Sequence, residues 1–138
     1  MRLLLIISFV LVAIFHVVGL QFDWYYTVPW LDIPMHMMGG AWVALFFWHV
    51  ASLWSHSFLA EKKWLVVAAG LGVVAVVGIG WEIFELFMDV VVLRQYGLLN
   101  APGQVHYDTL TDLTNDLVGA GVALWMLERR NTKRSLVE

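Results

Sequence analysis

Three aspartates recur at intervals of four residues in the segment HYDTLTDLTNDLVGAG, residues 106–121. Residues four apart lie on one face of an α-helix, so Asp108, Asp112 and Asp116 would form a stripe of carboxylates, with Asn115 beside it. Carboxylates in such a stripe can bind a divalent cation, retain protons, or form a buried polar network. Each of these roles needs partners from other parts of the chain.

Two earlier segments carry suitable partners. In WEIFELFMD, Glu82, Glu85 and Asp89 occupy positions i, i+3 and i+7 of one predicted helix face. In LDIPMHMMGG, Asp32 and His36 are four residues apart. Carboxylates alone favour Mg, Ca or Mn, whereas a histidine nitrogen also admits Zn or Fe. If these segments meet, the sequence predicts a divalent cation site.

The composition indicates which elements must position these residues. The chain has 138 residues, of which 61% are hydrophobic and only 14% charged, and its mean hydropathy is +0.77. About 20 apolar residues cross a bilayer. We therefore expect an all-α fold: a single domain, residues 1–138, that forms a bundle of four transmembrane helices. The predicted spans are residues 3–20, 34–60, 64–93 and 109–127.

Basic residues are distributed unevenly between the predicted loops. Arg2, Lys62, Lys63 and a group after the last span, Arg129, Arg130, Lys133 and Arg134, fall on one side of the bundle, and Arg94 falls on the other. The positive-inside rule then predicts an inner-membrane protein with both termini in the cytoplasm. The outward loops would be residues 21–33 and 94–107, with His106 in the second. Because the chain has no cysteine, disulfides and thiolate metal sites are excluded.

The acidic residues share one depth in this topology. At about 1.5 Å per residue, Glu82 lies roughly 27 Å along the third span, and Asp116 lies about 12 Å from the outer end of the fourth. A charge inside the bilayer costs at least ~2.5 kcal/mol, so these stripes should face the bundle interior. We expect an outward-facing acidic pocket. Its predicted metal ligands are Asp32, His36, Glu82, Asp89, Asp108, Asp112 and Asp116, and its predicted general base is Glu85 or His36.

Simpler roles are open for several of these residues. Asp108 and Asp32 are also suited to the first turn of a helix, where the helix dipole favours an acid. The pocket as a whole could hold protonated carboxylates or a structural polar network in place of a metal. His16 could join the pocket, and His49 and His56 fit interfacial or packing roles. The glycines in GLGVVAVVGIG and GAG fit close packing between helices.

The order of these motifs resembles the small four-helix membrane proteins of the YjdF-like and VanZ-like group. These proteins show an Asp-x-x-x-His segment, an acidic segment in a later span, and a final span with Asp, Asn or Asp, and Gly. The resemblance covers residues 32–121 and implies the four-helix architecture, but it implies no particular activity. The positions that match are Asp32, His36, Glu82, Glu85, Asp112, Asp116 and Gly119.

Two classes of function are compatible with the sequence. The first is a metal-dependent enzyme that acts on a lipid-linked substrate, in which the cation activates water or polarises the scissile group. The second is non-enzymatic: a cation- or proton-binding or transport protein, or a structural membrane protein with a buried polar network. Conduction through one protomer is disfavoured, because the inner half offers only His49 and His56. The expected partners are the lipid bilayer, a lipid-linked substrate and a second copy of the chain, and no nucleic acid.

Overall fold

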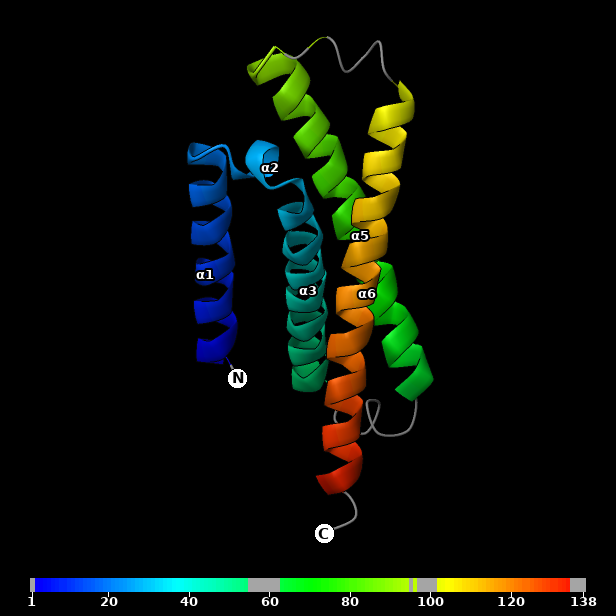
Figure 1. The fold of residues 1–138 in the computed structure, drawn as a ribbon. Coiled ribbons are helices and arrows are strands. Elements are labelled where there is room, and N and C mark those ends of the chain that lie inside the picture. Colours follow the sequence, from blue (N-terminus) through cyan, green and yellow to red (C-terminus); the bar gives the residue numbers. More distant parts are fainter. Residues whose placement is uncertain (1, 55–62, 95, 97–101, 135–138) are drawn as a thin grey trace.

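Helices account for nearly all of the described chain. The computed structural model describes residues 2–54, 63–94, 96 and 102–134. The long helices are α1 (Arg2–Gln21), α3 (Asp32–Trp54), α5 (Lys63–Phe87) and α6 (Pro102–Arg134). A short helix, α2 (Trp24–Thr27), and a 3-10 turn, η1 (Pro29–Leu31), join α1 to α3, and a π-helical turn, η2 (Met88–Val92), continues α5. The long helices alternate in direction, and both termini lie at one end (Figure 1).

The helices follow the four apolar stretches closely. The end of the second predicted span, residues 55–60, lies outside the described residues. The prediction of an outward loop through His106 was wrong for residues 102–107, because α6 already begins at Pro102. Proline is favourable at the first helical position, where its missing N–H would have no partner. The sequence pattern marked only the apolar part of this helix.

Two segments are long and apolar enough to cross a membrane. They are Arg2–Gln21, with a hydropathy of 2.9, and Lys63–Val92, with a hydropathy of 2.2. The described parts of α3 and α6 do not meet the same test, and α6 carries the aspartate stripe in its N-terminal half. The all-helical fold is thus confirmed. The crossing of the membrane by all four helices stays a prediction.

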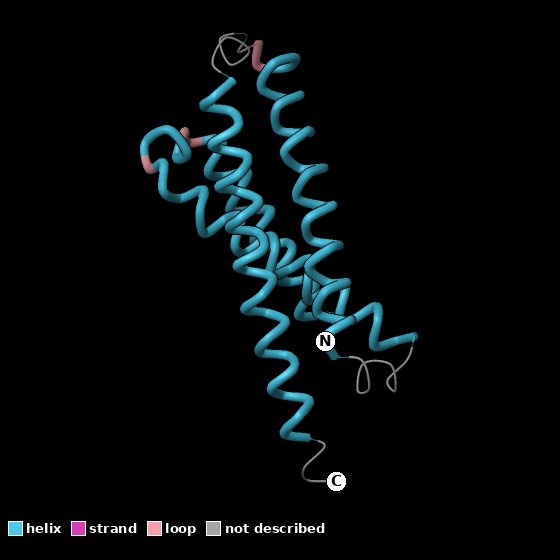
Figure 2. Tube along the Cα trace, turned by 90° about the vertical axis from the view of Figure 1, so that its right-hand side faces the viewer, coloured by secondary structure: helices cyan, strands magenta, loops and turns pink. Residues whose placement is uncertain are grey.

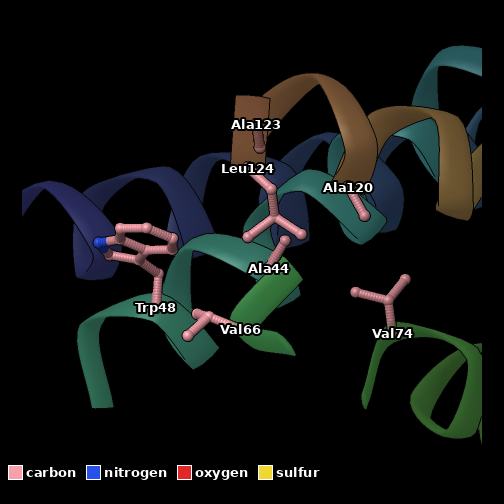
Figure 3. Packing of buried hydrophobic residues seen from close by; sticks show 7 residues of the cluster. All are labelled: Ala44, Trp48, Val66, Val74, Ala120, Ala123 and Leu124. Carbon is pink, nitrogen blue, oxygen red and sulfur yellow. The ribbon is translucent and has the colours of Figure 1, made fainter. Parts of the chain in front are cut away.

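The apolar core joins α3, α5 and α6, and it lies nearer than the acidic residues to the end of the bundle that holds both termini. Its buried members are Ala44, Trp48, Val66, Val74, Ala120, Ala123 and Leu124. Figure 3 shows Leu124 of α6 pointing toward Ala44 of α3. The small residues among them, Ala44, Ala120 and Ala123, let the helices approach closely.

Glycines bring α3 and α6 into backbone contact. A Cβ atom at Gly40 would collide with the backbone of Asp116, and one at Gly119 would collide with the backbone of Met37. On α5, a Cβ atom at Gly78 would lie 2.7 Å from Asp116 Oδ2. Figure 2 shows that the helices cross at an angle. Asp116 therefore lies where three helices meet.

Helix α1 is attached at the edge of the bundle. Only Leu5 and Gly19 are buried in it. Its main link to α3 is Trp42, whose indole Nε1 donates a hydrogen bond to the Leu5 carbonyl (2.9 Å) and whose ring lies 4.9 Å from that of Phe9. Most of its apolar surface remains exposed, as expected for a helix that faces lipid.

Candidate cation site

His36 lies at the centre of the candidate site. It is 8% exposed, and three aspartates surround its ring. Nε2 lies 3.6 Å from Asp32 Oδ1 and 3.8 Å from Asp112 Oδ1. Nδ1 lies 3.4 Å from Asp116 Oδ1. Nε2 thus faces one aspartate on its own helix and one on α6, and Nδ1 faces a second aspartate on α6.

The two distances at Nε2 are too long for hydrogen bonds; that to Asp32 reaches the spacing of ligands around a metal ion, and that to Asp112 is slightly longer. A hydrogen bond between these groups would be about 2.7–2.9 Å long. Two ligand atoms that each lie about 2.0–2.2 Å from one tetrahedral zinc ion are separated by roughly 3.3–3.6 Å. Ligand atoms of Asp32, His36 and Asp112 all lie within 4.8 Å of one another. We call these three residues the inner group.

Asp116 faces the other nitrogen of the same ring. It is 7% exposed and belongs to neither group of converging ligand atoms. A carboxylate beside Nδ1 favours the tautomer that carries the proton there, which leaves the Nε2 lone pair free to bind a cation. Asp116 is therefore placed to orient the ring.

A second group of converging ligand atoms lies beside the first and shares His36. Glu82 and Glu85 of α5 bring carboxylate oxygens within 4.8 Å of each other and of His36. We call these three residues the outer group. Glu82 Oε1 is fully buried and has no hydrogen-bond partner among the described residues. A buried carboxylate oxygen without a donor is costly, so its environment favours a positive charge.

A cleft of about 490 Å³ opens beside the outer group. Its walls come from α5, η2 and the first turns of α6. Four of its lining residues are acidic: Glu82, Glu85, Asp89 and Asp108. None of the described residues that line this cleft is a lysine, arginine or histidine. The cleft therefore presents a strongly negative surface that leads to His36.

Helix α2 contributes Tyr25, a residue that the sequence did not single out. The Tyr25 hydroxyl is hydrogen-bonded to His16 Nδ1 (2.8 Å), and the His16 ring stands edge-on to Trp81 of α5. Burial, together with the charges of Asp32 and Glu85, raises the pKa of Tyr25 to about 12. Tyr25 thus keeps its hydroxyl proton while it is hydrogen-bonded to His16. Tyr25 could not be found from helical spacing, because a turn separates residues 16 and 25 and they do not lie on one continuous helix.

The structure brings most of the predicted site residues together. Five fall in the inner and outer groups, and Asp89 and Asp108 line the cleft without joining either group. His16 is held by Tyr25 and joins neither group. His49 is partly buried far along α3 from His36, and His56 lies outside the described residues. The Asn115 side-chain nitrogen is buried with no partner in the described part of the chain.

Comparison with known proteins places the chain in one family. No curated protein and no solved structure matches it. Residues 1–133 match the sequence profile of a family described as predicted membrane protein DUF2238. This match covers almost the whole chain and agrees with the apolar composition and the long helices. The chain therefore belongs to the DUF2238 family of predicted membrane proteins.

Proposed function

We propose that this protein is a four-helix inner-membrane protein that binds one divalent cation through the inner group, Asp32, His36 and Asp112. In this proposal the chain is a single transmembrane domain with both termini in the cytoplasm and the cleft open to the outside. The observation that carries the proposal is the convergence of these three side chains around His36 Nε2. The finer resemblance to the YjdF-like and VanZ-like proteins remains part of the proposal.

The combination of one nitrogen and two oxygen ligands favours a metal ion of intermediate hardness. One imidazole nitrogen and two carboxylates suit Zn²⁺, Fe²⁺ or Mn²⁺, whereas Mg²⁺ and Ca²⁺ prefer oxygen alone. Three protein ligands also leave coordination positions open for water or substrate, which is the arrangement of catalytic rather than structural zinc sites. The inner group is therefore suited to chemistry as well as to binding.

The chemistry that fits this arrangement is hydrolysis of a lipid-linked substrate. A bound cation lowers the pKa of water and polarises the oxygen of an ester or phosphoryl group. Glu85 lines the cleft beside His36, where it can accept the proton of the attacking water. The cleft is negative, so an anionic headgroup would depend on the cation for its binding. A substrate from the outer leaflet would enter between η2 and α6.

A structural polar network is the second candidate. Protonated His36 would form ion pairs with Asp32, Asp112 and Asp116 at the observed distances, and no metal would then be needed. Conduction through one protomer has less support, because the buried core between the site and the inner end of the bundle is apolar in the described residues. Metal content distinguishes the two candidates.

Asp112→Asn tests the proposed site. We expect wild-type protein purified in mild detergent without chelator to contain about one divalent metal per chain, and Asp112→Asn to lose it, because the amide is neutral and binds metal weakly. Elemental analysis measures both. His36→Gln should give the same loss and guards against a folding defect peculiar to one variant.

Asp23→Asn is the matched control. Asp23 is an exposed carboxylate outside the site, and its φ of 54° suits asparagine equally well. This variant should keep its metal. A metal-free wild type, or undiminished metal in Asp112→Asn with helical content intact, would refute the cation site and favour the polar network.

A further inference from the structure

The outer group links the acidic cleft to the inner group through the shared His36. Glu82 and Glu85 line the cleft, and their ligand atoms reach the same histidine that the inner group uses. Asp112 and His36 are only 4% and 8% exposed, whereas the Asp32 side chain is 32% exposed. A cation from the cleft therefore meets the two glutamates before it meets Asp112.

We propose that Glu82, Glu85 and His36 form a loading position that receives the cation from the cleft and passes it to the inner group. This inference rests on the proposed function, because it presumes that the inner group is the resident site. It assigns to the glutamates a transient role in the movement of the metal. The ligand concerned is the same divalent cation.

The shared histidine makes the two positions mutually exclusive. Asp116 faces Nδ1, so Nε2 is the nitrogen left for a metal. One nitrogen lone pair binds one cation at a time. The inner and outer groups are thus alternative positions of a single ion, which moves by exchanging glutamate oxygens for aspartate oxygens around His36.

The unpartnered oxygen of Glu82 supports a cation position at the outer group independently of the ligand spacing. Glu82 Oε1 is buried and accepts no hydrogen bond among the described residues. Its desolvation is not offset by a protein donor, but a cation beside it would offset the cost. This oxygen could therefore bind a cation, because the described side chains offer it no hydrogen-bond donor.

Transfer to the inner group also explains how Glu85 can serve two purposes. While the cation occupies the outer group, Glu85 is a ligand and cannot accept a proton. Once the cation has moved to Asp32 and Asp112, the Glu85 carboxylate is free to act as the base of the proposed reaction. Loading would therefore precede catalysis in an obligatory order.

Glu85→Gln tests the loading position through the kinetics of metal exchange. Metal-free full-length protein in detergent is mixed with Co²⁺, whose visible absorption reports its ligands, and the ion is later removed with excess chelator. Removal of a ligand from an intermediate raises the barrier in both directions. We expect loading and release each to slow about tenfold, while the Kd changes less than about threefold and saturation stays at one ion per chain.

Asp89→Asn is the matched control, because it removes one negative charge from the same cleft outside both groups. It should slow loading modestly, in a salt-dependent way, and should leave release unchanged. Wild-type exchange rates in Glu85→Gln would overturn the loading position. So would complete loss of Co²⁺ at saturation, which would make Glu85 a resident ligand, or two ions bound per wild-type chain. No bound ion in wild type would instead defeat the proposed function itself.

Discussion

At the scale of single residues, the two nitrogens of His36 face different carboxylates, and the proposed cation site would give them separate roles. Nε2 faces Asp32 and Asp112, and Nδ1 faces Asp116. A carboxylate behind a metal-binding histidine fixes the tautomer and the orientation of the ring, and it makes the other nitrogen a better ligand. The three aspartates around one ring are therefore not equivalent, although two of them lie on the same helix face.

Asp116→Asn tests this division of tasks. We expect the variant to bind one cation at saturation, with an affinity lowered about 10- to 100-fold, because the ring loses the charge that orients it but keeps its metal ligands. Titration with Co²⁺ measures the affinity and the stoichiometry. Asp108→Asn, at the cleft wall, should stay close to wild type. Failure of Asp116→Asn to bind at any concentration would make Asp116 a direct ligand.

Helical spacing predicted which residues share a face but not how the faces meet. The i, i+4 relation of Asp32 and His36 and the stripe of Asp112 and Asp116 could be read from the sequence, and the structure places them around one ring. The division between Nε2 and Nδ1 depends on the angle at which α6 crosses α3. That angle is set by tertiary packing, so local periodicity cannot supply it.

At the scale of the helices, the contact between α3 and α6 determines the geometry of the site. Gly40 follows His36 by one turn and lies against Asp116, and Gly119 lies against Met37. The missing side chains let the two backbones touch, which brings the carboxylates of α6 to the histidine of α3. The same small residues that pack the helices thus define the distances between the ligands.

Gly119→Leu should separate the two helices and abolish metal binding. A Cβ atom at this position already collides with the backbone of Met37, and backbone cannot move aside as a flexible side chain can. We also expect a lower midpoint of thermal unfolding in detergent, by several degrees or more. Circular dichroism and elemental analysis measure these effects.

Gly121→Leu is the control for this substitution, because nothing lies within 4 Å of a Cβ atom placed there. It should keep both the metal and the wild-type stability. If Gly119→Leu also binds metal normally, the close contact of α3 and α6 does not position the ligands. Comparison of Gly119→Leu with Gly121→Leu therefore separates the effect of lost helix packing from the effect of adding a large side chain to α6.

The prediction that the glycines pack between helices was confirmed for some positions and wrong for others. Gly70, Gly78 and Gly119 lie against other helices, whereas Gly72 and Gly80 face open space. The motifs place glycines two residues apart, which on a helix point in different directions. The π-helical turn at Met88–Val92 was also not predictable, because an i to i+5 hydrogen bond leaves no pattern of apolar residues.

At the scale of the whole molecule, the alternating helices place both termini at one end (Figure 1). The composition and the four apolar stretches were sufficient to predict an all-helical fold. The full length of α6 could not be predicted, because the turns outside its apolar segment carry polar residues and resemble a loop in sequence. Hydropathy finds the part of a helix that prefers lipid and says little about how far it continues into water.

Cysteine labelling can test the orientation directly, since the natural chain contains no cysteine. We expect Thr27→Cys, in α2, to react with a membrane-impermeant maleimide in sealed right-side-out vesicles. Asn131→Cys, near the C-terminus, should react only after detergent is added. The two variants control for each other's reactivity. The opposite labelling pattern would place the cleft on the cytoplasmic side and exclude a substrate from the outer leaflet.

In the proposed topology, the unbroken length of α6 would link the hydration of the site to the thickness of the bilayer. The Arg129 guanidinium lies 3.9 Å from the centre of the Trp125 ring, a pair suited to the inner headgroup region. Asp112 is thirteen residues from Trp125 on the same helix, or about 20 Å along its axis. If Trp125 marks the inner boundary of a hydrocarbon layer of about 30 Å, the proposed cation site would lie roughly 10 Å below the outer boundary. Hydrophobic mismatch would change this depth. A thin membrane would expose the site to water, and a thick membrane would bury it in hydrocarbon.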